Sequence, residues 1–156
     1  MIIKVIGLME AMEVLYYVFG LFLLVAGLQD SKNRKVSHKL SACMWVLGAG
    51  LCVLNPCLYP YLAGVFALLY LYNAFAYPIN PKFGFGWADI LIIPVYATFV
   101  YSIGGNLALM VGIGTASVLT LAYLLLFKKG APYVMAMAAS YVVVLMAVRL
   151  VVVPGA

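Results

Sequence analysis

The sequence predicts an all-α membrane protein, folded as a compact bundle of six transmembrane helices. Of the 156 residues, 68% are hydrophobic and 8% are charged, whereas charged residues make up about a quarter of a soluble domain. The apolar runs lack the alternation of apolar and polar residues that marks barrel strands. Inside hydrocarbon, such runs must be helical to satisfy their backbone groups. We find no linker or internal repeat, so residues 1–156 are predicted to form one domain.

Six apolar segments approach the length of a spanning helix, which needs roughly 20 residues with a range of about 17–25. They lie at about 8–29, 38–54, 59–76, 88–103, 106–127 and 132–153. Pro56 and Pro78 close the second and third segments, because proline removes a helical hydrogen bond. Gly104 and Gly105 predict the turn between the fourth and fifth segments. Pro132 opens the sixth, at a position where its missing N–H is not needed.

The first segment has one alternative interpretation, a cleaved signal peptide. A signal peptide has a basic start, a short apolar core and a small-residue cleavage site. Here Lys4 is followed by Glu10 and Glu13, and the apolar run ends in Gln29-Asp30-Ser31. We therefore favour a spanning helix, with the two glutamates near its membrane interface.

The distribution of Lys and Arg predicts the orientation of the bundle. Seven of the nine basic residues fall in the odd-numbered loops, and the second and fourth loops have none. These seven are Lys32, Arg34, Lys35, Lys39, Lys82, Lys128 and Lys129. Because cytoplasmic loops carry the basic excess, these loops are predicted to face the cytoplasm, with both termini outside. A multi-pass protein of the plasma membrane is expected. The net charge of +5 then reflects topology rather than nucleic acid binding.

Only four residues are acidic, and two of them are predicted to meet. Asp30 ends the first segment and Asp89 opens the fourth, so both are expected at the cytoplasmic end of the bundle. Ionisable groups beside spanning helices indicate a functional site. Two carboxylates at one depth suit an aspartic dyad, in which one is protonated and the other acts as a base. Two alternatives stay open: separate helix ends facing headgroup water, or a cation or proton site of a small transporter or channel.

The residues around both aspartates resemble a known family. The stretch "DSKNRKVS" begins at Asp30, and "GFGWAD" ends at Asp89. Together they resemble the type IV prepilin and preflagellin (prearchaellin) peptidases, which are intramembrane aspartic proteases of the GxGD type. The archaeal form of the second motif, Gly-x-hydrophobic-Asp, is matched by Gly86-Trp87-Ala88-Asp89. Bacterial members usually have glycine where this chain has Ala88, so the archaeal-like branch is favoured.

This resemblance implies an aspartic endopeptidase that removes the short basic leader from pilin-like or archaellin precursors at the cytoplasmic membrane boundary. Such signal peptide processing serves a type IV pilus or an archaellum. The implied catalytic residues are Asp30 and Asp89. The supporting loop residues are Gly84, Gly86, Trp87 and Ala88, and the two glycines let an extended substrate backbone come close. No cofactor is implied.

Other chemistry-bearing residues are assigned to simpler roles. Cys43, Cys52 and Cys57 form no CxxC pair, so we expect neither a structural metal nor the methyltransferase activity of large bacterial members. The single histidine, His38, stands among lysines at a helix start and is expected to be solvated. On the fifth segment, small residues recur at a spacing of four and predict close helix packing. They are Ala108, Gly112 and Ala116.

Overall fold

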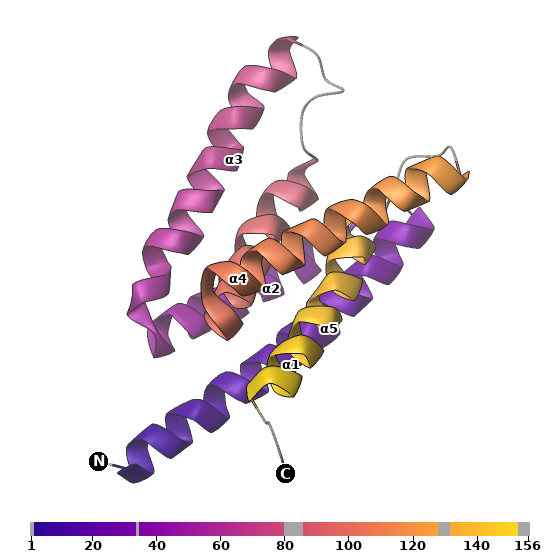
Figure 1. The fold of residues 1–156 in the computed structure, drawn as a ribbon. Helices are drawn as coiled ribbons and strands as arrows, with labels where there is room; N and C mark the ends of the chain where they lie inside the picture. The colour runs from indigo at the N-terminus through magenta and orange to yellow at the C-terminus, as the bar shows by residue number, and fades with distance from the viewer. Residues whose placement is uncertain (1, 34, 80–85, 128–131, 153–156) are drawn as a thin grey trace.

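A computed structural model of the chain describes residues 2–33, 35–79, 86–127 and 132–152 (Figure 1). Its elements are α1 (Ile2–Asn33), α2 (His38–Leu54), the short 3-10 helix η1 (Pro56–Leu58), α3 (Tyr59–Ile79), α4 (Trp87–Phe127) and α5 (Tyr133–Val152). The prediction of an all-helical chain is confirmed for these residues. In the described chain, α1, α3 and α4 are long and apolar enough to cross a membrane, and α2 and α5 are shorter apolar helices. Six separate spans and their orientation stay predictions.

The expected fourth and fifth segments form one element, α4, which is bent at two glycines. Gly104 has φ −155° and ψ 25°, and Gly105 has φ 63° and ψ −148°, so neither is helical. The positive φ of Gly105 favours a residue without a Cβ atom. The second arm (106–127) turns back across the first (87–103), since a Cβ atom at Gly112 would lie 2.8 Å from the Tyr96 hydroxyl and 3.1 Å from Val100. The predicted turn is thus a sharp bend between two helical arms.

Three helix boundaries differ by three or more residues from those expected. α1 begins at Ile2 rather than near residue 8 and ends at Asn33 rather than near residue 29, so Asp30 lies within its last turn. α3 continues through Pro78 to Ile79. A proline so close to a helix end removes only one hydrogen bond, and the helix stops one residue later.

An aromatic cluster joins α1, the first arm of α4 and α5. Phe19 stacks on Phe99 with ring centroids 4.0 Å apart, and Tyr141 meets Phe19 edge-on at 5.2 Å. All three side chains are fully buried. The Tyr141 hydroxyl donates to the Tyr16 carbonyl oxygen at 3.2 Å, and the Tyr16 hydroxyl donates to that of Ser102 at 3.4 Å. These contacts fix how the three helices are aligned along one another.

This alignment determines which ends of the helices meet. α1 runs antiparallel to the first arm of α4, because Tyr16 contacts Ser102 while Phe19, further along α1, contacts Phe99, which comes earlier in α4. Each step toward the end of α1 is therefore a step toward the start of α4. The last turn of α1 consequently lies beside the first turn of α4, where Asp89 is found.

Small residues allow the closest helix contacts. A Cβ atom at Gly27 would lie 2.9 Å from the Cα atom of Met135, so α1 and the start of α5 meet backbone to backbone. On the second arm of α4, Ala108, Gly112 and Ala116 are all buried. The predicted packing role of these three residues is confirmed.

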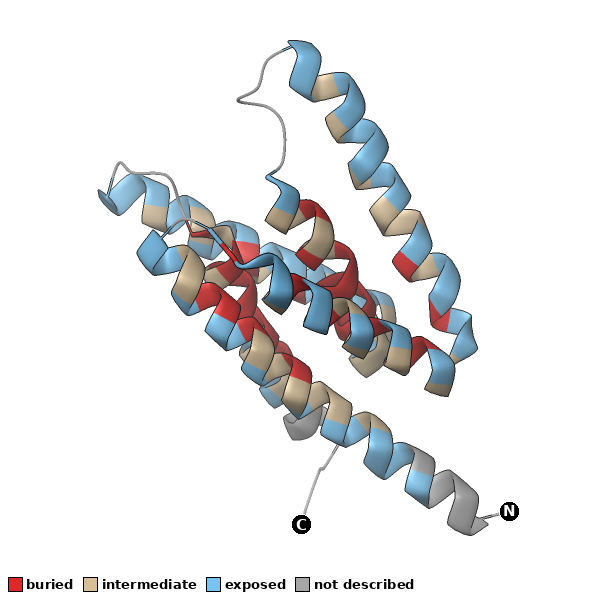
Figure 2. Cartoon of the chain, turned by 180° about the vertical axis from the view of Figure 1, so that it is seen from behind, coloured by how far each residue is buried: buried red, intermediate tan, exposed pale blue. Residues whose placement is uncertain are grey.

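α3 is packed far more loosely than the other long helices. Leu62 is its only buried residue, and Figure 2 shows most of α3 in the colour of exposed residues. Near its start, Tyr61 stacks on Tyr101 of α4 with centroids 4.1 Å apart. Toward Ile79 the helix stands away from the rest of the bundle (Figure 1).

Candidate active site

Asp30 and Asp89 line one cavity of about 270 Å³ at the end of the bundle where α1 finishes and α4 begins. The two carboxylates interact electrostatically, and both residues are partly buried. Side chains 59 positions apart in the sequence are therefore neighbours in the fold. Their juxtaposition follows from the antiparallel alignment of α1 and α4.

Asp30 is held by the start of α5. Its Oδ2 atom accepts a hydrogen bond from the backbone N–H of Val134 at 3.1 Å. The first N–H groups of a helix have no partner within the helix, and the helix dipole favours negative charge there. The bond is possible because Gly27, one turn before Asp30, brings α5 close at Met135. Asp30 thus caps a helix other than its own.

Asp89 is held by the start of its own helix. It is the third residue of α4, and its carboxylate accepts from the backbone N–H of Gly86. The Ile90 N–H in turn donates to the Gly86 carbonyl oxygen at 3.1 Å. An acidic residue at this position that reaches back to the helix start forms half of a capping box. A Cβ atom at Gly86 would lie 3.3 Å from Asp89 Oδ2, so the glycine leaves the carboxylate uncrowded.

The N-terminal ends of two helices therefore face the two carboxylates. α4 and α5 both begin at the cavity, and their partial positive charges stabilise negative charge there, while the carboxylates repel one another. Tyr133, the first residue of α5, also interacts electrostatically with Asp89. When such a pair shares one proton, a water between the two groups would meet a base on one side and a proton donor on the other. The arrangement is thus able to support hydrolysis.

The residues expected to support the pair are partly in place. Gly86, Trp87 and Ala88 line the cavity, while Gly84 lies outside the described residues. Trp87 is 60% exposed, so its indole stands at the rim rather than within the core.

Two basic residues of the cavity wall were not expected there, Lys35 and His38. His38 is exposed, as the sequence suggested, but it faces the carboxylates' cavity as well as solvent. The short connection from α1 to α2 brings it there. Ser37 caps α2 by accepting from the Leu40 N–H at 3.3 Å, and its own N–H donates to Gln29 Oε1 at 3.2 Å. The sequence signal that could have predicted this placement was the short connection between the first two expected helices.

Comparisons of the chain with models of known protein families, with curated proteins and with solved structures find no match.

Proposed function

We propose that the protein is an intramembrane aspartic endopeptidase that uses Asp30 and Asp89 to activate a water molecule. The supporting observation is the single cavity that both carboxylates line. In this mechanism the pair shares one proton. The ionised partner takes a proton from water as the water oxygen attacks the peptide carbonyl carbon, and the protonated partner donates to the carbonyl oxygen. The intermediate collapses when the C–N bond breaks and the leaving amine receives a proton.

The proposed substrates are pilin-like or archaellin precursors, as the motif resemblance implies. Such a precursor has a short basic leader, a small residue and a long apolar helix. The leader's charges hold it in the cytoplasm, while the apolar helix lies in the bilayer. The bond between them is then presented at the cytoplasmic membrane boundary. The product is a mature subunit that begins at its apolar helix.

The proposed membrane arrangement is six spans with both termini outside. The 41 residues of α4 would extend about 60 Å as one straight helix, twice the roughly 30 Å of bilayer hydrocarbon. The bend at Gly104 and Gly105 supports two crossings instead. Lys32, Lys35 and Lys39 belong to the end of the bundle that carries the cavity, which supports a cytoplasmic active site. Labelling of a cysteine placed at Asn106 tests this orientation, because that residue is then external.

The test of function is cleavage of a synthetic precursor by the purified protein in lipid nanodiscs, with sequencing of the product's N-terminus. Asp30→Asn and Asp89→Asn are each expected to reduce the rate by about 10²–10⁴-fold or more, because the amide cannot act as the base. Glu10→Gln is the control, since it removes one of the other carboxylates and should cleave like the wild type. Circular dichroism checks that all variants are folded.

Two outcomes would contradict the proposal. Wild-type rates in either aspartate variant would remove that residue from catalysis. Absence of cleavage by the wild type, together with cation or proton uptake that requires both aspartates, would identify a transporter.

A further inference from the structure

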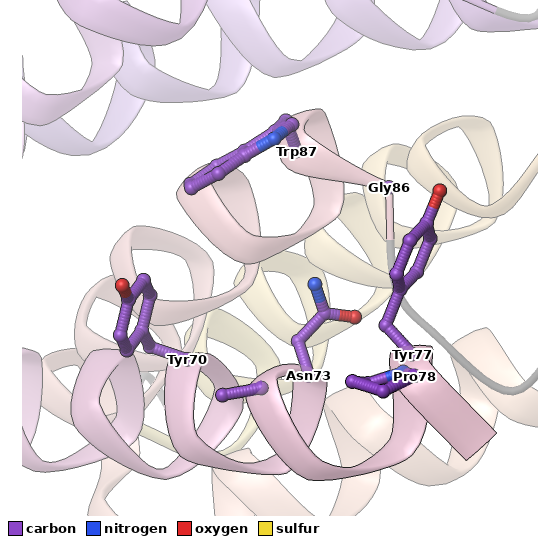
Figure 3. A pocket seen from close by; sticks show the side chains of 7 residues that line it. Tyr70, Asn73, Tyr77, Pro78, Gly86 and Trp87 are labelled. Atoms are coloured by element: carbon purple, nitrogen blue, oxygen red, sulfur yellow. The ribbon is translucent and has the colours of Figure 1, made fainter. Parts of the chain in front are cut away.

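A second hollow lies beside the carboxylate cavity, between α3 and the start of α4 (Figure 3). Its volume is about 490 Å³. It is lined on α3 by Tyr70, Asn73, Ala74, Tyr77 and Pro78, and at the start of α4 by Gly86 and Trp87. Tyr70, Asn73 and Tyr77 are spaced three and four residues apart, so they share one face of α3. We call this hollow the α3–α4 cleft.

The cleft and the carboxylate cavity adjoin each other. Gly86 and Trp87 line both. At Gly86 the boundary has no side chain, and the indole of Trp87 stands exposed beside it. An extended chain bound at the carboxylates therefore has a direct path into the cleft, past the backbone of Gly86.

The chemistry of the cleft suits a neutral peptide segment. Asn73 offers both an acceptor and donors, as a peptide group requires, and Figure 3 shows its amide directed toward the space below Trp87. Tyr70, Tyr77 and Trp87 add aromatic faces that pack against apolar side chains. None of the described residues that line the cleft is charged. The basic residues Lys35 and His38 instead line the carboxylate cavity.

The cleft also has the length of a short peptide. From Tyr77 to Tyr70 the helix rises about 10 Å, which corresponds to about three residues of extended chain. Gly86 is shared with the carboxylate cavity, and Tyr70 lies about two turns along α3 from Pro78. A segment that leaves the carboxylates past Gly86 and lies in the cleft therefore runs along this face of α3.

We propose that the α3–α4 cleft binds about the first three residues on the apolar, mature side of the scissile bond, in extended form. This inference rests on the proposed peptidase function. Among the described residues, the wall provides no counter-ion for a basic leader, which favours the apolar side. Asn73 then satisfies peptide groups that the substrate helix must release for its bond to reach the carboxylates.

Two tyrosines of α3 provide a matched test. Tyr70 lines the cleft and Tyr72 does not, yet both are 49% exposed. Each is replaced by the photocrosslinker p-benzoylphenylalanine in Asp89→Asn protein, which keeps the substrate intact. The probe is a synthetic precursor with a lysine-containing leader, one small residue and an apolar segment of roughly 20 residues, in nanodiscs. Position 70 is expected to crosslink to the first residues of the apolar segment at least about fivefold more than position 72.

A kinetic comparison keeps the proposal falsifiable if crosslinking is inefficient. Tyr70→Ala is expected to raise KM about tenfold with little change in kcat, because it removes one aromatic contact. Tyr72→Ala is the control and should leave both constants unchanged. Equal effects of the two variants would overturn the assignment.

These experiments distinguish a wrong assignment of the α3–α4 cleft from a wrong assignment of peptidase activity. Suppose that the wild type cleaves the precursor, but position 70 crosslinks to the leader or to lipid, or crosslinks no more than position 72 does. The assignment of the cleft is then wrong, and the peptidase proposal stands. If position 70 crosslinks to the apolar segment but the wild type does not cleave, binding in the cleft is supported and the peptidase is wrong.

Discussion

α1 and α3 are both long and apolar, but the fold uses them differently. α1 buries Phe19, Leu23 and Ala26 against its neighbours, whereas α3 buries only Leu62. The asymmetry matters for the site, since α1 carries a carboxylate and α3 carries the looser wall of the cleft. Under the proposed function, the packed helix would hold a catalytic group and the exposed helix would border the substrate.

The difference between the two helices is visible in their glycines. At Gly20 and Gly27 of α1, an added Cβ atom would approach Tyr141 to 3.2 Å and the Met135 backbone to 2.9 Å. At Gly64 of α3 nothing lies within 4 Å. Apolar composition therefore indicates that a helix is compatible with lipid. Close approach by a neighbouring helix indicates that it is packed against protein.

The largest effect on stability is expected from paired phenylalanine variants. Phe19 on α1 is fully buried, and Phe75 on α3 is 73% exposed. Phe19→Ala is expected to lower the free energy of unfolding by about 3–5 kcal/mol, because it leaves a cavity beside Phe99 and Tyr141. Phe75→Ala should change it by less than about 0.5 kcal/mol. Unfolding with SDS in mixed micelles measures both, and similar losses would show that α3 is packed as tightly as α1.

A smaller effect on the free energy of unfolding is expected when glycines are replaced by alanine. Gly27→Ala should lower the free energy of unfolding by about 1–3 kcal/mol, since the new methyl group meets backbone that cannot rotate away. Gly64→Ala should be neutral or stabilise the protein by up to about 1 kcal/mol, because alanine favours a helix. The same SDS titration measures both variants.

Gly27→Ala should also slow cleavage, because Val134 moves away from Asp30. Wild-type stability and rate in Gly27→Ala would refute the close contact.

The smallest effect on the free energy of unfolding is expected when tyrosine hydroxyls are removed. Tyr16→Phe removes the hydrogen bond from α1 to the Ser102 carbonyl oxygen. A single interhelical bond in a membrane contributes about 0.6 kcal/mol on average, so a loss of this size is expected. Tyr59→Phe on the exposed start of α3 is the control and should have no measurable effect. A larger loss at Tyr59 than at Tyr16 would reverse the comparison between the two helices.

Much of the helical layout was predictable because its signals are local. The apolar runs indicated the helices, and Gly104-Gly105 marked the bend of α4, since only glycine readily takes the positive φ found at position 105. The scarcity of acidic residues singled out Asp30 and Asp89 before their positions were known. Helix ends were less accurate, as at Asn33, because the residues of a last turn differ little from those of a following loop.

By itself the sequence determined a helical, membrane-compatible chain with two notable carboxylates, because hydrophobicity and turn chemistry act over a few neighbouring residues. Only the tertiary structure decided that α1 is packed while α3 is exposed, that Lys35 and His38 reach the carboxylates' cavity, and that the α3–α4 cleft adjoins it. The physical reason is that lipid and protein interior are equally apolar, so hydrophobicity does not say which face of a membrane helix meets which. Shape does, through contacts such as Gly27 with Met135 that join residues more than a hundred positions apart.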